Sequence, residues 1–185
     1  MTAHPRIGRE GLSTYSPLLG WKTVFGYTWK KVFREVTVDY KVEKTPHRVD
    51  VLWEGNTLKE EEIVLFLNRF SPYRRGEEET MEEYLENAPD FIPCNRASDG
   101  SFFLLSLSSI LYLREKATVN EEGSTKMRLH FGEEISLEVE QVQPLPHGRT
   151  RPLDILNTPG RFLSFLYGGR RLFTNRSRIR WADPL

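Results

Sequence analysis

Short runs of alternating apolar and polar residues are the clearest pattern in this chain. Residues 49–53 read Val-x-Val-x-Trp, and residues 127–131 read Met-x-Leu-x-Phe. A second alternating run follows each of them, at residues 63–67 and 135–139. A period of two places every second side chain on the same face of a strand. The pattern therefore predicts two pairs of β-strands, one pair in each of two regions of the chain.

Each strand pair is followed by a predicted short helix. Thr80 and Glu83 fit a capping box, in which a hydroxyl side chain and a glutamate satisfy the first free amides of a helix. Asn87-Ala88-Pro89 then ends the helix, because the residue before a proline avoids the helical conformation. In the second region, Leu153–Asn157 ends before Pro159 in the same way.

A hairpin and a last strand are predicted to close each region. Residues 99–112 align without gaps on residues 168–181. Both segments have a turn, an apolar strand, a polar break, and then Ile followed two residues later by an aromatic residue. Gly168-Gly169 is typical of a two-residue hairpin turn. The last strands are predicted around Ile110–Leu113 and Ile179–Trp181.

The repeated order of elements predicts two tandem units, residues 48–119 and 125–185. The polar residues 120–124, which include Gly and Ser, would link them. The expected fold class is α+β and mainly β, with two small bent-sheet or half-barrel units that each carry one short helix. A unit of about 60 residues buries little apolar surface when alone. We therefore expect the units to pack face to face as one pseudo-symmetric body.

The same order of elements resembles small uncharacterised bacterial β-rich domains of unknown function. Residues 151–163, Arg-Pro-Leu-Asp-Ile-Leu-Asn-Thr-Pro-Gly-Arg-Phe-Leu, carry this likeness best. It extends over residues 48–182 and implies a tandem pair of such domains. The first unit departs from it, because Arg161 has no counterpart there and Asp90 lies nearby instead. The resemblance implies no activity.

Residues 1–47 lie outside the repeat and consist of a tail followed by an aromatic segment. A helix beginning at Ser16-Pro17 would place an apolar stripe on one face, whereas residues 21–29 also alternate as a strand would. Residues 36–42 are predicted to be a strand. The apolar face would pack on the body of the protein, dock on a partner protein or lie on a membrane surface. The candidate partner-binding residues in this segment are Trp21, Phe25, Trp29 and Phe33.

Charge adds a second candidate contact surface. The chain has 26 basic and 26 acidic residues among 185 and no net charge. Acidic residues nevertheless concentrate in residues 60–86 and basic residues in 161–180, so the two regions would pair within a chain or between copies. Arginines alternate at the end of the chain, which on a strand would place them on one face. The candidate contact residues there are Arg170, Arg171, Arg176, Arg178 and Arg180.

The chain shows no catalytic or metal-binding motif. The single cysteine, Cys94, lies in a predicted strand and is expected to be a small buried apolar residue. The four histidines have no metal-ligand spacing, and no paired carboxylates suggest acid–base catalysis. Residues 95–100 look like half of the cyclic-dinucleotide motif of PilZ-type barrels, but Arg69 and Arg74 are one residue too far apart for the other half. A plain hairpin turn explains residues 95–100 equally.

These observations predict a cytoplasmic, non-catalytic macromolecular binding protein without a cofactor. The N-terminus lacks the pattern of a secretory signal, and no run is long and apolar enough to cross a membrane. The expected function is that of a protein-binding adaptor or structural subunit, and the sequence leaves open whether the chain also forms a homo-oligomer. Single-stranded nucleic-acid binding by the arginines is the alternative, and a cyclic-dinucleotide receptor is a further one.

Overall fold

The computed structural model describes residues 43–55, 59–142 and 151–185. The predicted helix or strand at residues 17–33 and the predicted strand at 36–42 lie outside these ranges. The described residues form ten strands, two short α-helices and two 3₁₀ helices. In chain order they are β1 (Lys44–Trp53), β2 (Glu61–Asn68), α1 (Met81–Asn87), β3 (Phe91–Arg96), β4 (Phe102–Ser106), η1 (Leu107–Ser109), β5 (Ile110–Thr118), β6 (Lys126–His130), β7 (Ser136–Gln141), α2 (Pro152–Leu156), β8 (Phe162–Tyr167), β9 (Arg170–Asn175), η2 (Arg176–Arg178) and β10 (Trp181–Pro184).

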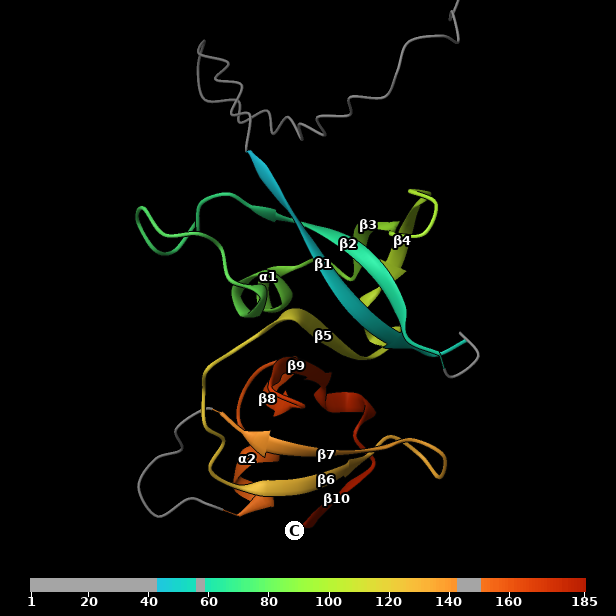
Figure 1. The fold of residues 1–185 in the computed structure, drawn as a ribbon, viewed down its shortest axis with the longest axis vertical. Helices are drawn as coiled ribbons and strands as arrows, with labels where there is room; N and C mark the ends of the chain where they lie inside the picture. The colour runs from blue at the N-terminus through green and yellow to red at the C-terminus, as the bar shows by residue number, and fades with distance from the viewer. Residues whose placement is uncertain (1–42, 56–58, 143–150) are drawn as a thin grey trace, which may run out of the picture.

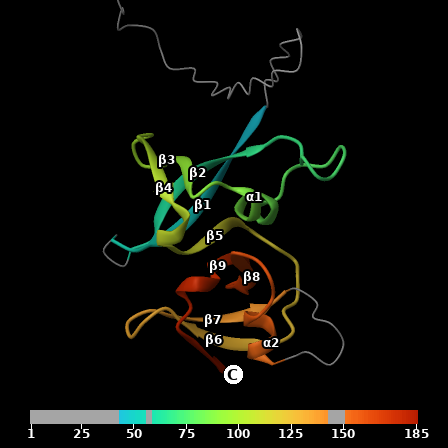
Figure 2. The same ribbon diagram turned by 180° about the vertical axis from the view of Figure 1, so that it is seen from behind.

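The protein is mainly β, as predicted, and its strands form one antiparallel sheet (Figures 1 and 2). The strand order is β10-β6-β7-β8-β9-β5-β1-β2-β3-β4. We call β1–β5 the first half and β6–β10 the second half. Within each half, the fifth strand pairs with the first, and the remaining strands follow in chain order. Strands β5 and β9 join the halves, so β4 and β10 are the two edges of the sheet.

The predicted alternation is confirmed where it can be checked. In β2, Ile63, Leu65 and Leu67 are fully buried while the residues between them are half-buried. In β6, Met127 and Leu129 are likewise fully buried. Burial of every second side chain against a core removes apolar surface from water, which stabilises the strand where it lies.

Local signals for helix and turn are also confirmed. The amide of Glu83 donates to Thr80 Oγ1 at 3.3 Å, and the amide of Thr80 donates to Glu83 Oε2 at 3.2 Å, which completes the capping box of α1. Gly168 and Gly169 have φ angles of 58° and 73° between β8 and β9. Both central residues of a two-residue hairpin need positive φ, which glycine adopts without steric cost.

The predicted last strand is wrong at its start. Residues 176–178 form the 3₁₀ helix η2, and β10 begins only at Trp181. The side chain of Asn175 stabilises this turn, because its Oδ1 accepts hydrogen bonds from the amide and the hydroxyl of Ser177 at 3.1 and 2.8 Å. A capping side chain of this kind stabilises a helical turn against an extended backbone.

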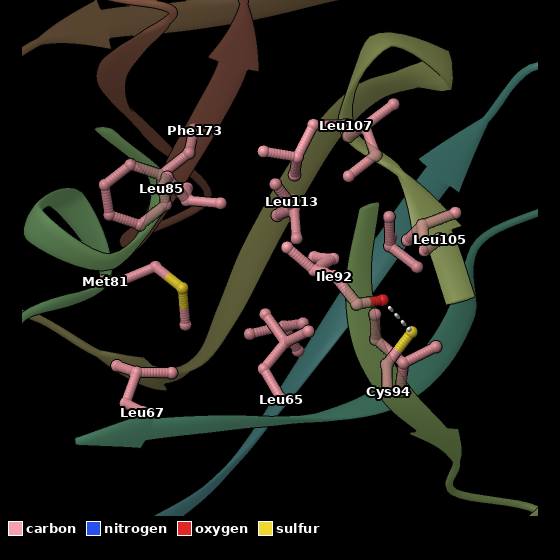
Figure 3. Packing of buried hydrophobic residues seen from close by; sticks show 14 residues of the cluster. Leu65, Leu67, Met81, Leu85, Ile92, Cys94, Leu105, Leu107, Leu113 and Phe173 are labelled. Atoms are coloured by element: carbon pink, nitrogen blue, oxygen red, sulfur yellow. Dashed lines mark hydrogen bonds between the residues drawn. The ribbon is translucent and has the colours of Figure 1, made fainter. Parts of the chain in front are cut away.

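The apolar side chains form two cores, one in each half. The first core is built mainly from β1–β5 and α1, and Figure 3 shows its central side chains. The second is built mainly from β6–β9 and α2. Each core also contains residues from the other half, so apolar side chains interlock across the junction between the halves.

Candidate functional site

The four N-terminal candidates, Trp21, Phe25, Trp29 and Phe33, lie outside the described residues. The structure therefore describes only the C-terminal arginines among the predicted contact residues. In the described ranges no group of three His, Cys, Asp or Glu side chains is placed to hold a metal ion. No helix of the described part is both long and apolar enough to span a membrane.

Cys94 is buried, as its strand position predicts. Burial raises the pKa of its thiol to about 12, because a thiolate is poorly solvated among apolar side chains. The thiol therefore stays protonated and unreactive at neutral pH.

The C-terminal arginines do not form the predicted strip. Arg176 and Arg178 lie on η2 instead of a strand, so the expected alternation on one strand face is absent. Arg178 donates to Glu54 Oε1 at 2.8 Å, and Arg176 donates to the carbonyl of Thr158 at 2.9 Å. Arg180 precedes β10 and is exposed.

The two remaining arginines of that set lie on β9. Arg171 pairs with Glu121 at 2.5 Å and approaches Glu82 of α1 at 4.0 Å. The hydrogen bond to Glu121 is the main reason that the pKa of Arg171 is raised. Arg170 is half-buried where β9 pairs with β8 and the end of β5. Of the five arginines, Arg171 and Arg178 thus have carboxylate partners within the chain.

Strand pairing joins the two halves. Leu113 of β5 lies opposite Phe173 of β9, and Tyr112 lies opposite Thr174. Next to them, the buried Asn175 side chain donates from Nδ2 to the carbonyl of Leu107 at 3.0 Å. A buried amide with satisfied partners holds the register of such a junction, because shifting it would leave polar groups unpaired.

Apolar side chains cross the junction in both directions. Phe173 of the second half is 2% exposed and lies in the first core, among the side chains around Leu85 and Leu113 (Figure 3). In return, Leu52 and Tyr112 of the first half lie in the second core, where the Tyr112 ring is 6.0 Å from Phe131. The two cores therefore stabilise each other.

Polar contacts across the junction join the basic C-terminal region to the first half. The amide of Arg161 donates to Glu86 of α1 at 3.2 Å, and its guanidinium lies 3.4 Å from Asp90. Together with the approach of Arg171 to Glu82, the contact with Glu86 joins part of the acidic region to the basic region within one chain. These contacts are at least partly exposed, so each contributes about 1 kcal/mol or less.

A buried charge network lies on β1 and β5, on the side facing the second half. Asp50 is paired with Arg114 at 3.1 Å and with Lys116. Burial opposes ionisation of Asp50, but hydrogen bonds from Lys116 and Arg114 outweigh it and lower the pKa of the carboxyl. Burial and a 2.9 Å hydrogen bond to Glu60 raise the pKa of Tyr112. Because each of these charges is paired with an opposite charge, we interpret the network as structural.

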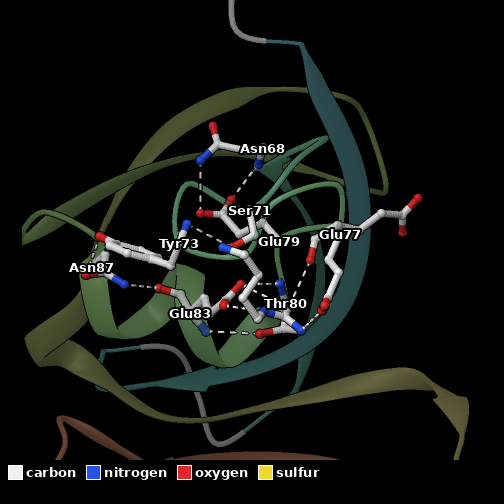
Figure 4. Close-up of polar contacts among 10 residues, drawn as sticks. Asn68, Ser71, Tyr73, Glu77, Glu79, Thr80, Glu83 and Asn87 are labelled. Carbon is white, nitrogen blue, oxygen red and sulfur yellow. Dashed lines mark hydrogen bonds and ion pairs between the residues drawn. The ribbon is translucent and has the colours of Figure 1, made fainter.

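A pocket of about 440 Å³ beside α1 is lined by Arg74, Thr80, Glu82, Glu83, Glu86 and Asn87, half of which are acidic. Several of these polar groups pair with each other or with the loop before α1, as Figure 4 shows. Arg74 binds Glu83 at 2.7 Å and also pairs with Glu77, and Tyr73 donates to Asn87 at 2.8 Å. The arrangement orders the loop before α1, and it engages the arginine that the cyclic-dinucleotide interpretation would need.

Large exposed apolar side chains gather at the two ends of the sheet. At the β3–β4 end, Phe91, Phe102 and Leu104 are 58%, 53% and 59% exposed. Phe102 and Leu104 share one face of β4, and Phe91 lies diagonally across from Leu104 on β3. At the other end, the exposed residues are Leu153, Trp181 and Leu185.

The alternation and charge patterns did not predict these ends as contact surfaces, although β4 carries a signal. Residues 102–105 read Phe-Phe-Leu-Leu. A strand that is apolar on both faces is typical of a strand covered on both sides, but the outer face of β4 is open here. On β10, Trp181 stacks on His130 with the ring centroids 4.5 Å apart, so the His130 side chain is partly covered.

No family model matches this chain, and neither a curated protein nor a solved structure matches it.

Proposed function

We propose that this protein is a non-catalytic protein-binding adaptor or structural subunit whose contact surfaces are the two ends of its sheet. The observation that carries the proposal is the group formed by Phe91, Phe102 and Leu104 at the β4 edge, each more than half exposed. Large contiguous apolar patches on soluble proteins mark interaction sites. Aromatic side chains in particular supply much of the energy of protein–protein contacts.

The strand edge itself supports the same proposal. An edge strand presents unpaired amides and carbonyls, and proteins usually protect such edges with charges or proline. Strand β4 reads Phe-Phe-Leu-Leu-Ser and has neither. A partner strand added to β4 would gain main-chain hydrogen bonds and cover the exposed side chains together.

We also propose that the two halves are tandem copies of one unit, as the sequence repeat predicts. Three observations support this interpretation. The strand order is the same in both halves. The first and fifth strands pair in equivalent registers, with Val51 opposite Leu113 and Leu129 opposite Ala182. The hairpin registers also agree, with Ile92 opposite Leu105 and Leu163 opposite Thr174.

Affinity capture tests the proposed function. The full chain serves as bait in an extract of the cells that produce it, next to the variant Phe102→Glu/Leu104→Glu and the control Phe70→Glu. Phe70 is 56% exposed and follows β2, which is not an edge strand of the sheet. Quantitative mass spectrometry is expected to find proteins retained by the wild type and by the control but lost from the double variant. If no captured protein depends on Phe102 and Leu104, the proposal is wrong.

A further inference from the structure

The junction between the two halves is a strand pairing that the open ends of the sheet can repeat. It joins β9, the fourth strand of the second half, to β5, the fifth strand of the first half. The two edge strands, each paired on one side only, are the counterparts of β9 and β5. Strand β4 is the fourth strand of the first half, and β10 is the fifth strand of the second (Figure 1). We propose that β10 of one copy pairs with β4 of another, so that copies of this chain assemble head to tail. This inference rests on the proposed function, because it names the partner of the sheet ends.

Equivalent residues define the register of this contact. In the alignment of residues 99–112 on 168–181, Leu104 corresponds to Phe173. Strand pairing with β1 and β6 makes Ala182 the counterpart of Leu113. Phe173 lies opposite Leu113 at the junction, so Ala182 of one copy lies opposite Leu104 of the next.

Burial supports the same contact from the β4 side. Phe173 is 2% exposed because the first half covers it, whereas its counterpart Leu104 is 59% exposed. Phe162 packs against the first core, whereas its counterpart Phe91 is 58% exposed. The junction thus covers Phe173 and Phe162 of the second half, whereas the corresponding side chains of the first half, Leu104 and Phe91, are exposed.

The β10 side shows the complementary pattern. Tyr112 of β5 is 5% exposed and packs near Phe131 in the second core. Its counterpart on β10 is Trp181, which is 46% exposed. The counterpart of Phe131 is Trp53, which lies beside the first core. A head-to-tail contact would therefore cover Trp181 of one copy near Trp53 of the next.

The side chains around the two ends match each other and differ from those of the junction. At the junction, Arg171 approaches Glu82. The counterpart of Arg171 is the exposed Phe102. With Asn87 aligned on Asn157, the counterpart of Glu82 is Pro152 at the start of α2. The open ends thus have two uncharged residues where the junction has an ion pair, and this difference separates contacts between copies from contacts within a chain.

A contact between two different surfaces is not two-fold symmetric. Repeating it produces a closed ring or an open filament. Sedimentation velocity of the full chain over a wide concentration range is expected to show species larger than the monomer. A discrete mass would indicate a ring, and masses that grow with concentration would indicate a filament. A monomer at every concentration would overturn the proposal.

Two variants that each block one end make the test specific. Leu104→Glu blocks the β4 end, and Trp181→Glu blocks the β10 end, because Tyr112, the counterpart of Trp181, is covered at the junction. Both side chains are exposed, so far-UV circular dichroism should match the wild type. Each variant alone is expected to be monomeric, and an equal mixture is expected to form a species of twice the monomer mass, joined by the remaining free ends. A mixture that stays monomeric while the wild type assembles would contradict head-to-tail pairing.

Disulfide trapping tests the register. Leu104→Cys and Ala182→Cys, introduced in separate chains and mixed under mild oxidation, are expected to form a cross-linked heterodimer. Phe70→Cys replaces Leu104→Cys in the control. The native Cys94 is buried, with a pKa of about 12, and does not compete. Equal cross-linking in the control would overturn the proposed register.

The outcomes separate this inference from the proposed function. A chain that is monomeric but still captures another protein through Phe102 and Leu104 would refute self-assembly and retain the protein-binding function. A chain that is monomeric and captures no protein through Phe102 and Leu104 would refute both proposals.

Discussion

The β3–β4 hairpin of the first half and the β8–β9 hairpin of the second half have equivalent registers, but only one of them is covered. Phe173 on β9 is 2% exposed, whereas Leu104 at the corresponding position on β4 is 59% exposed. Both side chains are large and apolar. The difference arises because β5 and α1 lie beside β9, while β4 is an edge of the sheet. A strand's own residues therefore set which faces are apolar, and its neighbours decide which faces are buried.

The charged residues around the two hairpins differ in the same sense. Arg161 and Arg171 of the second half pair with acidic residues of the first half, including Asp90 and Glu82. At the open hairpin, Phe102 stands where Arg171 stands at the junction. The junction thus combines apolar packing with charge pairing, whereas the open end offers mainly apolar surface.

The largest expected effect distinguishes the two corresponding apolar side chains. Phe173→Ala would leave a cavity in the first core and lower the free energy of unfolding by about 3–5 kcal/mol. Leu104→Ala is expected to change it by less than about 0.5 kcal/mol at low protein concentration, because the side chain is exposed there. Urea denaturation followed by circular dichroism measures both. Equal losses would show that β4 is covered in the isolated chain.

Removing the polar side chain of Asn175, two residues after Phe173, is expected to have the next largest effect on the free energy of unfolding. Asn175→Ala would remove the buried hydrogen bond from Asn175 Nδ2 to the carbonyl of Leu107 and the cap of η2, which costs about 1–3 kcal/mol. The matched control is Ser106→Ala, because Ser106 corresponds to Asn175 and bonds only to the nearby Ser108 through its hydroxyl. Denaturation of both variants tests this difference. A similar small loss in both would mean that the junction does not depend on the amide.

The pH dependence of stability is expected to distinguish the β1–β5 pair of the first half from the β6–β10 pair of the second half. Asp50 lies opposite Arg114 in the first half, and Arg128 lies opposite Asp183 in the second, with the charges exchanged. The folded state lowers the pKa of Asp50, so this group stabilises the protein above the ordinary pKa of aspartate, about 4, and that stability is lost as the pH falls through the lowered value. Asp50→Asn is therefore expected to destabilise the protein at neutral pH and to flatten the acid side of the profile.

Asp183→Asn provides the comparison for that measurement. Asp183 pairs with His130 at the open edge and is more than half exposed, so its removal is expected to change stability little at neutral pH. Thermal unfolding between neutral and acidic pH measures both variants. An acid profile unchanged by Asp50→Asn would show that other carboxylates determine it.

The smallest expected effect concerns the exposed arginines at the end of the chain. Arg176→Glu/Arg180→Glu is expected to change stability by less than about 0.5 kcal/mol and to leave capture of protein partners unchanged. Fluorescence anisotropy with labelled single-stranded RNA and DNA measures the alternative function at about 50 and 200 mM salt, where phosphate-driven binding differs most. We expect no salt-dependent binding. Strong binding at low salt that the variant loses would instead favour the nucleic-acid function.

Much of the fold was predictable because the relevant contacts are local. The capping box joins Thr80 to Glu83, three residues away, and the two-residue turn needs only Gly168 and Gly169. The alternation of β2 and β6 was also readable, because period two is a property of the strand itself. The prediction failed at residues 176–180, where alternating arginines suggested a strand. There a single side chain, Asn175, caps a 3₁₀ turn that the alternation does not show.

The candidate site was harder to predict because it depends on the lack of a neighbouring strand on the outer side of β4. The consecutive apolar residues of β4 indicate two apolar faces, and the usual interpretation is burial on both. Nothing in residues 102–105 states that β4 lies at an edge. Likewise, the sequence pattern of Arg171 and Arg178 predicts an exposed basic surface. In the fold, Glu82 and Glu121 lie beside Arg171, and Glu54 lies beside Arg178.

The sequence by itself determined the strands, the turns, the helix caps and the mainly β class, because these depend on residues that are close together along the chain. The tertiary structure alone decided that β5 pairs with β9, that Phe173 enters the first core and that β4 and β10 are edges. Those outcomes depend on contacts between residues far apart in the sequence. Their energy comes from apolar surface removed from water, and corresponding residues of the two hairpins differ in burial only because their neighbours differ.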